Sequence, residues 1–252
     1  MPEPYVAVLE EGQLQEDAVV GGIPLEFLFN TDADYHRVLF DLICRCTLSP
    51  ALGGLGQACV LLDTEATFSM LEFGAFIDTY LAAKSVPCRE EMINKVLDSV
   101  FVVSARTVSE CILGLWSIRD LLKRTPTISL LLIDSISACF GPYLPRKDWA
   151  ASQTVFFDML SHLTDHFRLS SVVCRLLAND QEEKEAIEKL HQQADANGSA
   201  SFDSSTAVFK PALRIHFLKG DYTADRIPVR LHRETSSSKD GIYYRLNSSH
   251  SC

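Results

Sequence analysis

The sequence predicts an α/β protein built around a largely parallel β-sheet. Between residues 23 and 176, apolar runs of strand length alternate with segments of helical periodicity, a pattern typical of a parallel sheet covered by helices. Two of the apolar runs, at 58–62 and 130–133, end in an acidic residue. Three short strands follow near the C-terminus, and we expect them to form an antiparallel β meander beside the parallel strands.

The composition is that of a globular chain with one large domain. The 252 residues are 47% hydrophobic, which is ample for a sizeable core. The formal net charge of −10 argues against strong independent binding to nucleic acid, because free-standing binders usually carry a basic surface. No apolar run reaches the roughly 18–20 residues that span a bilayer, and no secretory signal is visible. We therefore expect an intracellular protein without membrane contact.

The eight cysteines do not form a recognisable framework. No C-x-x-C occurs, so a zinc ribbon is not expected. Several lie within apolar strands or helices, where a reduced thiol behaves as a small hydrophobic group; these are Cys59, Cys111, Cys139 and Cys174.

Glycine, proline and charge mark the elements of the first half. Gly21-Gly22 precedes the first strand, and the G-G-L-G run at 53–56 precedes the second. Pro87 ends one helix, and Lys123-Arg124 suits the C-terminus of another. We expect strands at 23–29, 58–62 and 100–104, and helices at 35–48, 69–84, 90–97 and 107–122.

The second half begins with a strand at 128–133 and a loop at Pro142 and Pro145. Residues 178–206 carry seven acidic residues against two lysines, which predicts a mobile acidic loop near 178–209. We expect a helix at 149–167, a strand at 170–176, and meander strands at 213–218, 227–231 and 242–246.

The domain organisation is expected to be simple. Residues 1–20 form an acidic N-terminal segment whose apolar run at 5–9 can add a strand to this chain or to a partner. Residues 21–252 form a single core domain.

Three motifs resemble the eukaryotic and archaeal RecA-like recombinases. Residues 52–68 match their GG-x-G turn, apolar strand and D-T-E-G-T-F run, with Ala66 in place of the glycine. Residues 130–138, L-L-L-I-D-S-I-S-A, are similar to the strand-end aspartate motif of that family, Walker B, and residues 213–227 to its R-L-x-L-x-K-G…R-I hairpin. The resemblance implies a RecA-like three-layer core. The chain shows no counterpart of the small helical N-terminal domain, which favours the short recombinase paralogues.

The phosphate-binding loop of the family is degenerate here. In an ungapped alignment its first glycine falls on Phe29, its later glycines on Asp32 and Asp34, its lysine on Tyr35 and its Ser/Thr on His36. A working loop cradles phosphates with bare backbone N–H groups and a lysine. Two unit charges about 4 Å apart repel by roughly 4 kcal/mol at an effective dielectric constant of about 20. We expect nucleotide binding in the family's mode to be lost, and we assign no catalytic residue.

Other positions depart from the family as well. Its asparagine–glutamine pair that senses the nucleotide is replaced by Arg175-Leu176, and the DNA-contacting loop that follows is acidic. The D-S-P turn that caps a neighbour's nucleotide becomes Glu234-Thr235-Ser236.

The strand-end acids Asp134, Glu65 and Asp63 are candidates for a partner contact or a residual metal site. Glu65 holds the position that activates the attacking water in the family, and here we interpret it as a relic. Asp63 and Thr64 are expected to fix the turn through local hydrogen bonds. No metal site is assigned, because His162 and His166 lack the H-E-x-x-H pattern.

A single basic cluster lies near the C-terminus. It is a candidate DNA or partner contact, and the alternative is a solvated β meander. Its main members are Lys210, Arg214, Lys219, Arg226 and Arg230.

The resemblance implies a non-hydrolysing recombinase paralogue in the nucleus. Such a subunit would form a heterodimer with another paralogue and assist loading or remodelling of recombinase filaments on single-stranded DNA in homologous recombination. It would hold no cofactor of its own, with ATP and Mg²⁺ at an interface with the partner. The alternatives are a weak, unconventional DNA-dependent ATPase and an adaptor that reuses the fold outside DNA repair.

Overall fold

The computed structural model describes the backbone of residues 9–10, 24–30, 35–140, 150–177, 213–217, 226–233 and 236–245. Side chains are described for 24–29, 35–140, 151–177 and 215–217. The expected acidic loop at 178–209 and the proline loop at 142–145 lie outside the described residues, as does all of the segment 1–20 except Leu9 and Glu10.

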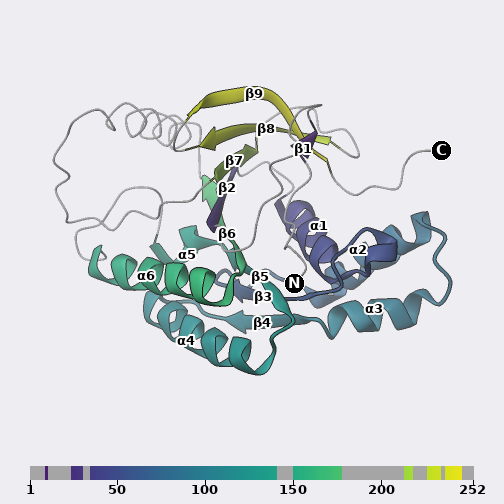
Figure 1. The fold of residues 1–252 in the computed structure, drawn as a ribbon, viewed down its shortest axis with the longest axis horizontal. Helices are drawn as coiled ribbons and strands as arrows, with labels where there is room; N and C mark the ends of the chain where they lie inside the picture. The colour runs from purple at the N-terminus through teal and green to yellow at the C-terminus, as the bar shows by residue number, and fades with distance from the viewer. Residues whose placement is uncertain are drawn as a thin grey trace.

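A mixed sheet runs through the described part of the chain (Figure 1), with the strand order β1-β9-β8-β7-β2-β6-β5-β3-β4. The six strands from β7 to β4 are all parallel. Antiparallel pairs join β7 to β8, β8 to β9, and β9 to β1. The strands are β1 (Leu9–Glu10), β2 (Pro24–Asn30), β3 (Ala58–Asp63), β4 (Val100–Ser104), β5 (Ile128–Asp134), β6 (Ser170–Leu177), β7 (Leu213–Phe217), β8 (Arg226–Arg233) and β9 (Ser236–Arg245).

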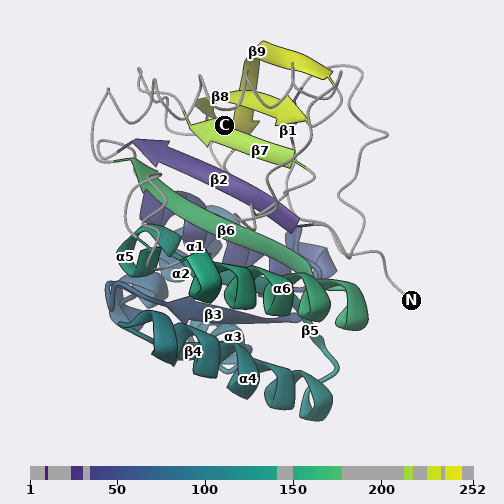
Figure 2. The same cartoon turned by 90° about the vertical axis from the view of Figure 1, so that its left-hand side faces the viewer.

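Helices cover both faces of the parallel strands. Figure 2 shows α4, α5 and α6 in front of the sheet, with α1, α2 and α3 behind it. The prediction of an α/β protein with a parallel sheet between helical layers, as in a RecA-like core, is confirmed. The helices are α1 (Tyr35–Thr47), α2 (Met70–Ala83), α3 (Arg89–Leu97), α4 (Val108–Arg124), α5 (Ile136–Phe140) and α6 (Ala150–Phe167), with a 3₁₀ turn, η1, at Pro50–Leu52.

Two apolar cores hold the layers together, one on each face of the sheet. Successive strand residues point to opposite faces. On β3, Cys59 and Leu61 belong to the core under α1, α2 and α3, whereas Val60 and Leu62 belong to the core under α4, α5 and α6. A strand that is buried on both faces requires the continuous apolar runs that the sequence shows.

Local signals in the sequence set the helix boundaries. The Thr107 side chain accepts a hydrogen bond from the Glu110 backbone N–H, and the Glu110 carboxylate accepts from the Thr107 N–H in return, so α4 begins with a capping box. Helix α1 is buried along most of its length, and its charged Asp41 and Arg45 form an ion pair at 2.7 Å. Pairing and hydrogen bonding offset the cost of burying two charges.

Two short elements were not expected from the sequence. Helix α5 follows β5 after one residue, and η1 lies in the turn between α1 and β3. Both are too short for a hydrophobic period to repeat, so periodicity cannot detect them. In the described residues, no helix combines the length and hydrophobicity that a bilayer crossing needs.

The glycine-rich turn before β3 generates a test of the fold. Gly54 packs so closely that an added Cβ would lie 2.1 Å from the Leu48 carbonyl oxygen, which is rigid backbone. Gly74, on α2, has nothing within 4 Å of the equivalent position. We predict that Gly54→Ala lowers the free energy of unfolding by about 2 kcal/mol or more, whereas Gly74→Ala raises it by up to about 1 kcal/mol.

Urea denaturation followed by circular dichroism measures both changes. Equal effects of the two substitutions would show that the turn is not packed as described.

Candidate functional site at the carboxyl ends of β3 and β5

Two of the strand-end acids are side by side. Asp63 ends β3, Asp134 ends β5, and the two residues are direct register partners in the parallel ladder. Both side chains are buried: Asp63 is 4% exposed and Asp134 is 0% exposed. The carboxyl ends of parallel strands are where α/β proteins usually bind ligands. Because Asp134 is fully buried, it does not offer its carboxylate as a surface for a partner.

Asp63 fixes the turn that follows β3, as predicted. Its two carboxylate oxygens accept hydrogen bonds from the backbone N–H groups of Ala66, at 2.7 Å, and Phe68, at 3.4 Å. Ala66 has a φ of 57°, in the left-handed region. The left-handed conformation costs a residue with a Cβ roughly 1–2 kcal/mol. This cost explains why the D-T-E-G-T-F run of the RecA-like recombinases has a glycine at this position.

Thr64, by contrast, bonds across to the end of β5, so the prediction of a purely local role for it is wrong. Its backbone N–H donates to the Asp134 carbonyl at 2.7 Å, and its hydroxyl donates to the Ser135 carbonyl. The Ser135 hydroxyl in turn donates to the half-buried Glu65 carboxylate. These bonds tie the two strand ends into one unit.

The Asp134 carboxylate is buried beside two other acids, Asp63 and Glu65. Neither of its oxygens has a hydrogen-bond partner in the described part of the chain, and the ion pairs found there do not involve Asp63, Glu65 or Asp134. Burial, with the neighbouring charges of Asp63 and Glu65, raises the pKa of Asp134 to about 7. A large fraction of Asp134 is therefore protonated at neutral pH.

Tyr35 lies close enough to the acidic site to feel the charges of Asp134 and Glu65. It is the first residue of α1, and its hydroxyl lies 3.3 Å from the Thr67 hydroxyl. Burial raises the pKa of Tyr35 above its ordinary value, and the Asp134 and Glu65 charges raise it further. Tyr35 is thus a neutral group at the position where the phosphate-binding loop of the RecA-like recombinases has a lysine.

The other positions aligned with the phosphate loop have different surroundings. Phe29 is 1% exposed and its ring stacks on that of Phe217, with centroids 4.3 Å apart. The His36 ring lies 4.1 Å from the ring of Tyr35, and its Nε2 is buried without a hydrogen-bond partner among the described residues. Asp32 and Asp34 lie outside the described residues.

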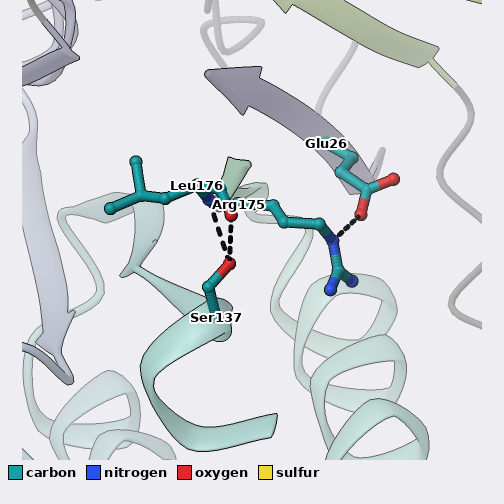
Figure 3. Close-up of polar contacts among 4 residues, drawn as sticks. All are labelled: Glu26, Ser137, Arg175 and Leu176. Carbon is teal, nitrogen blue, oxygen red and sulfur yellow. Dashed lines mark hydrogen bonds and ion pairs between the residues drawn. The ribbon is translucent and has the colours of Figure 1, made fainter. Parts of the chain in front are cut away.

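Arg175 and Leu176 take part in internal contacts at the end of β6 (Figure 3). The Arg175 Nε donates to the Glu26 carboxylate on β2 at 3.0 Å, and Glu26 is 1% exposed. The Ser137 hydroxyl on α5 donates to the Leu176 carbonyl and accepts from its N–H, both at 3.0 Å. Removing one member of a buried ion pair typically lowers the free energy of unfolding by about 3–5 kcal/mol. We therefore expect Arg175 to contribute to the stability of the fold.

The basic cluster is only partly described. Arg214 lies on β7 opposite His232 of β8, and Arg230 of β8 lies opposite His216 of β7. Arg226 begins β8. The side chains of these three arginines are not described, and Lys210 and Lys219 lie outside the described residues.

The described side chains contain no group of three or more His, Cys, Asp or Glu residues that could hold a metal ion. Sequence reasoning found Asp63, Glu65 and Asp134 but missed Ser135 and Thr67. The Ser135 hydroxyl donates to the Glu65 carboxylate, and the Thr67 hydroxyl is a hydrogen-bond partner of the Tyr35 hydroxyl. Both follow the acids closely in the sequence, which is the one signal that could have indicated them.

The burial of Asp134 predicts a pH dependence of stability. The folded protein binds a proton at Asp134 up to a pH of about 7, whereas the unfolded chain loses it near pH 3.9. The resulting stabilisation is fully present below about pH 4 and is lost as the pH rises through about 7, at about 1.4 kcal/mol per pH unit. We predict that Asp134→Asn removes this slope. Its unfolding free energy relative to the parent should rise by about 2 kcal/mol between pH 5.5 and 7 and then level off.

Urea denaturation at several pH values between 5.5 and 8.5 measures the effect. Asp158→Asn, at an exposed position on α6, is the control for losing one carboxylate. Parallel pH profiles for the parent and Asp134→Asn would contradict the description of this site.

Comparison with known proteins agrees with the resemblance that the sequence motifs indicate. No family model matches this chain. Over 125 residues it is 29% identical to the DNA repair protein XRCC2 of Mus musculus, an alignment that covers 50% of this chain and 44% of that protein. The matched part is thus less than half of the length of this curated relative. The similarity confirms the predicted resemblance to the RecA-like recombinase paralogues, and this chain is XRCC2-like over half of its length.

Proposed function

We propose that this protein acts in DNA repair by homologous recombination, as a recombinase paralogue subunit that does not hydrolyse ATP. It pairs with another paralogue and assists loading or remodelling of the recombinase filament on single-stranded DNA, and it works in the nucleus. The likeness to XRCC2, a DNA repair protein by name, supports the role in repair.

The observation that carries the non-hydrolysing part is the uncompensated acidic site. A triphosphate adds three or four negative charges, and phosphate sites supply cationic groups and bare N–H donors to receive them. Here the Asp134 and Glu65 carboxylates lie near Tyr35, a neutral group whose pKa is raised by burial and, further, by the charges of these two acids. The residues present do not fit a magnesium–triphosphate in the family's mode.

Two further contacts support this proposal. The position of the loop's first glycine holds Phe29, whose ring is part of an aromatic core with Phe27 and Phe217. The position of the nucleotide sensor holds Arg175, which is paired with the buried Glu26. Side chains at both positions thus make internal contacts within the fold.

The role as a partner subunit follows from what the fold retains. RecA-like domains assemble with one another, as the resemblance implies, and the parallel sheet with helices on both faces fits such a domain. ATP and Mg²⁺, if they take part, are then supplied at an interface with the partner. Contact with DNA through Arg214, Arg226 and Arg230 is part of the same proposal.

Affinity purification of the tagged full chain from cells, followed by mass spectrometry, tests the assignment. We expect a recombinase paralogue among the recovered proteins. Recovery of signalling or structural proteins alone would favour an adaptor outside DNA repair and would overturn the proposal.

The substitution Glu65→Gln distinguishes a scaffold role of this chain from a role as an ATPase. Glutamine keeps the shape of the side chain and an oxygen that accepts from Ser135, but it cannot act as a base toward water. We predict that Glu65→Gln restores recombination repair in cells lacking this chain to within about twofold of the parent, with equal recovery of the paralogue.

Asp158→Asn, on the exposed face of α6, is the matched control. Loss of repair by Glu65→Gln with normal paralogue recovery, beside an active control, would establish that hydrolysis by this chain is required.

A further inference from the structure

Two buried cysteines from different helices are in direct contact. The sulfur atoms of Cys111, on α4, and Cys139, on α5, lie 2.6 Å apart. A disulfide bond is about 2.05 Å long, and two sulfur atoms that only pack against each other stay well beyond 2.6 Å. Among the cysteines described, no other pair forms such a contact.

Cys139 is the member of the pair whose pKa and exposure favour reaction with an oxidant. The two sulfurs share a hydrogen bond in which either can be the donor. This contact lowers the pKa of Cys139, although burial acts in the opposite direction. The thiolate is the form that attacks peroxides and disulfides. Cys139 is also the more accessible of the two, at 5% exposed against 0% for Cys111.

The pair borders the strand-end site. Cys139 lies on the short helix that follows Asp134, and its sulfur is near Thr64, whose N–H and hydroxyl hold the ends of β3 and β5 together. A covalent bond from Cys139 to Cys111 would therefore attach this strand end to α4, the helix that covers the same face of the sheet.

We propose that Cys111 and Cys139 are an oxidation site, at which hydrogen peroxide converts the two thiols to an intrachain disulfide between α4 and α5. The proposal is independent of the proposed function. The contact distance and the position of both sulfurs in one core carry it.

The chemistry balances with peroxide as the oxidant. The Cys139 thiolate attacks the peroxide, an S–O bond forms, the O–O bond breaks, and hydroxide leaves and is protonated to water. The Cys111 sulfur then attacks the Cys139 sulfenic acid, the S–S bond forms, and the S–O bond breaks. The hydroxide that leaves takes the Cys111 proton as water. Two thiols are oxidised, and one peroxide is reduced to two water molecules.

Peptide mapping of the full chain tests the proposal. The protein is fully reduced, freed of reductant, and treated with hydrogen peroxide or buffer. Remaining thiols are then blocked with N-ethylmaleimide before digestion without reductant. We expect a reducible cross-link between the Cys111 and Cys139 peptides in the treated sample, while the other buried cysteines Cys44, Cys46, Cys59 and Cys174 stay blocked. Both peptides recovered as maleimide adducts from treated, folded protein would overturn the proposal.

Thermal unfolding supplies a second readout. A bond closing the loop from 111 to 139 restricts the unfolded chain, so the oxidised parent should unfold roughly 6–10 °C above the reduced parent. Cys139→Ser should abolish this shift, whereas Cys88→Ser, at the exposed thiol that precedes α3, should keep it. A shift that survives Cys139→Ser would refute the assignment. Should Cys139→Ser fail to fold, the peptide map of the parent decides alone.

Discussion

The structure depends on the register between β3 and β5, which puts two carboxylates at neighbouring strand ends. Asp63 and Asp134 are direct partners in a parallel ladder, and both are buried. Two buried acids at this separation repel unless a cation, a proton or hydrogen-bond donors intervene. Hydrogen bonds and a proton reduce this repulsion here, and the function that we propose rests on the lack of a cation among the described residues of the site.

Each acid is stabilised by a different means. Asp63 accepts two backbone N–H groups of the turn that follows it, and Glu65 accepts the Ser135 hydroxyl. Asp134 receives neither a donor nor a cation from the described residues, and its raised pKa shows that a proton takes their place. The same site is unfavourable to phosphate, because Tyr35 adds no positive charge to it.

The sequence allowed the layered α/β fold and the position of the acids at strand ends to be predicted, because apolar runs that lead into an acid are visible in the sequence. It did not allow prediction of helix α5 or of the 3₁₀ turn, which are too short for a hydrophobic period to repeat. The protonation of Asp134 depends on burial and on Asp63 and Glu65, which belong to a different segment of the chain, and no spacing rule predicts how close the two segments lie. The Cys111–Cys139 contact was hidden for the same reason: each cysteine was correctly predicted to be buried, but burial does not reveal which thiols meet.

We expect that this chain does not hold a triphosphate by itself, and equilibrium binding of fluorescently labelled ATP to the isolated full chain with Mg²⁺ is the decisive test. No saturable binding is expected up to millimolar nucleotide. A dissociation constant in the micromolar range that is lost on adding EDTA would contradict it.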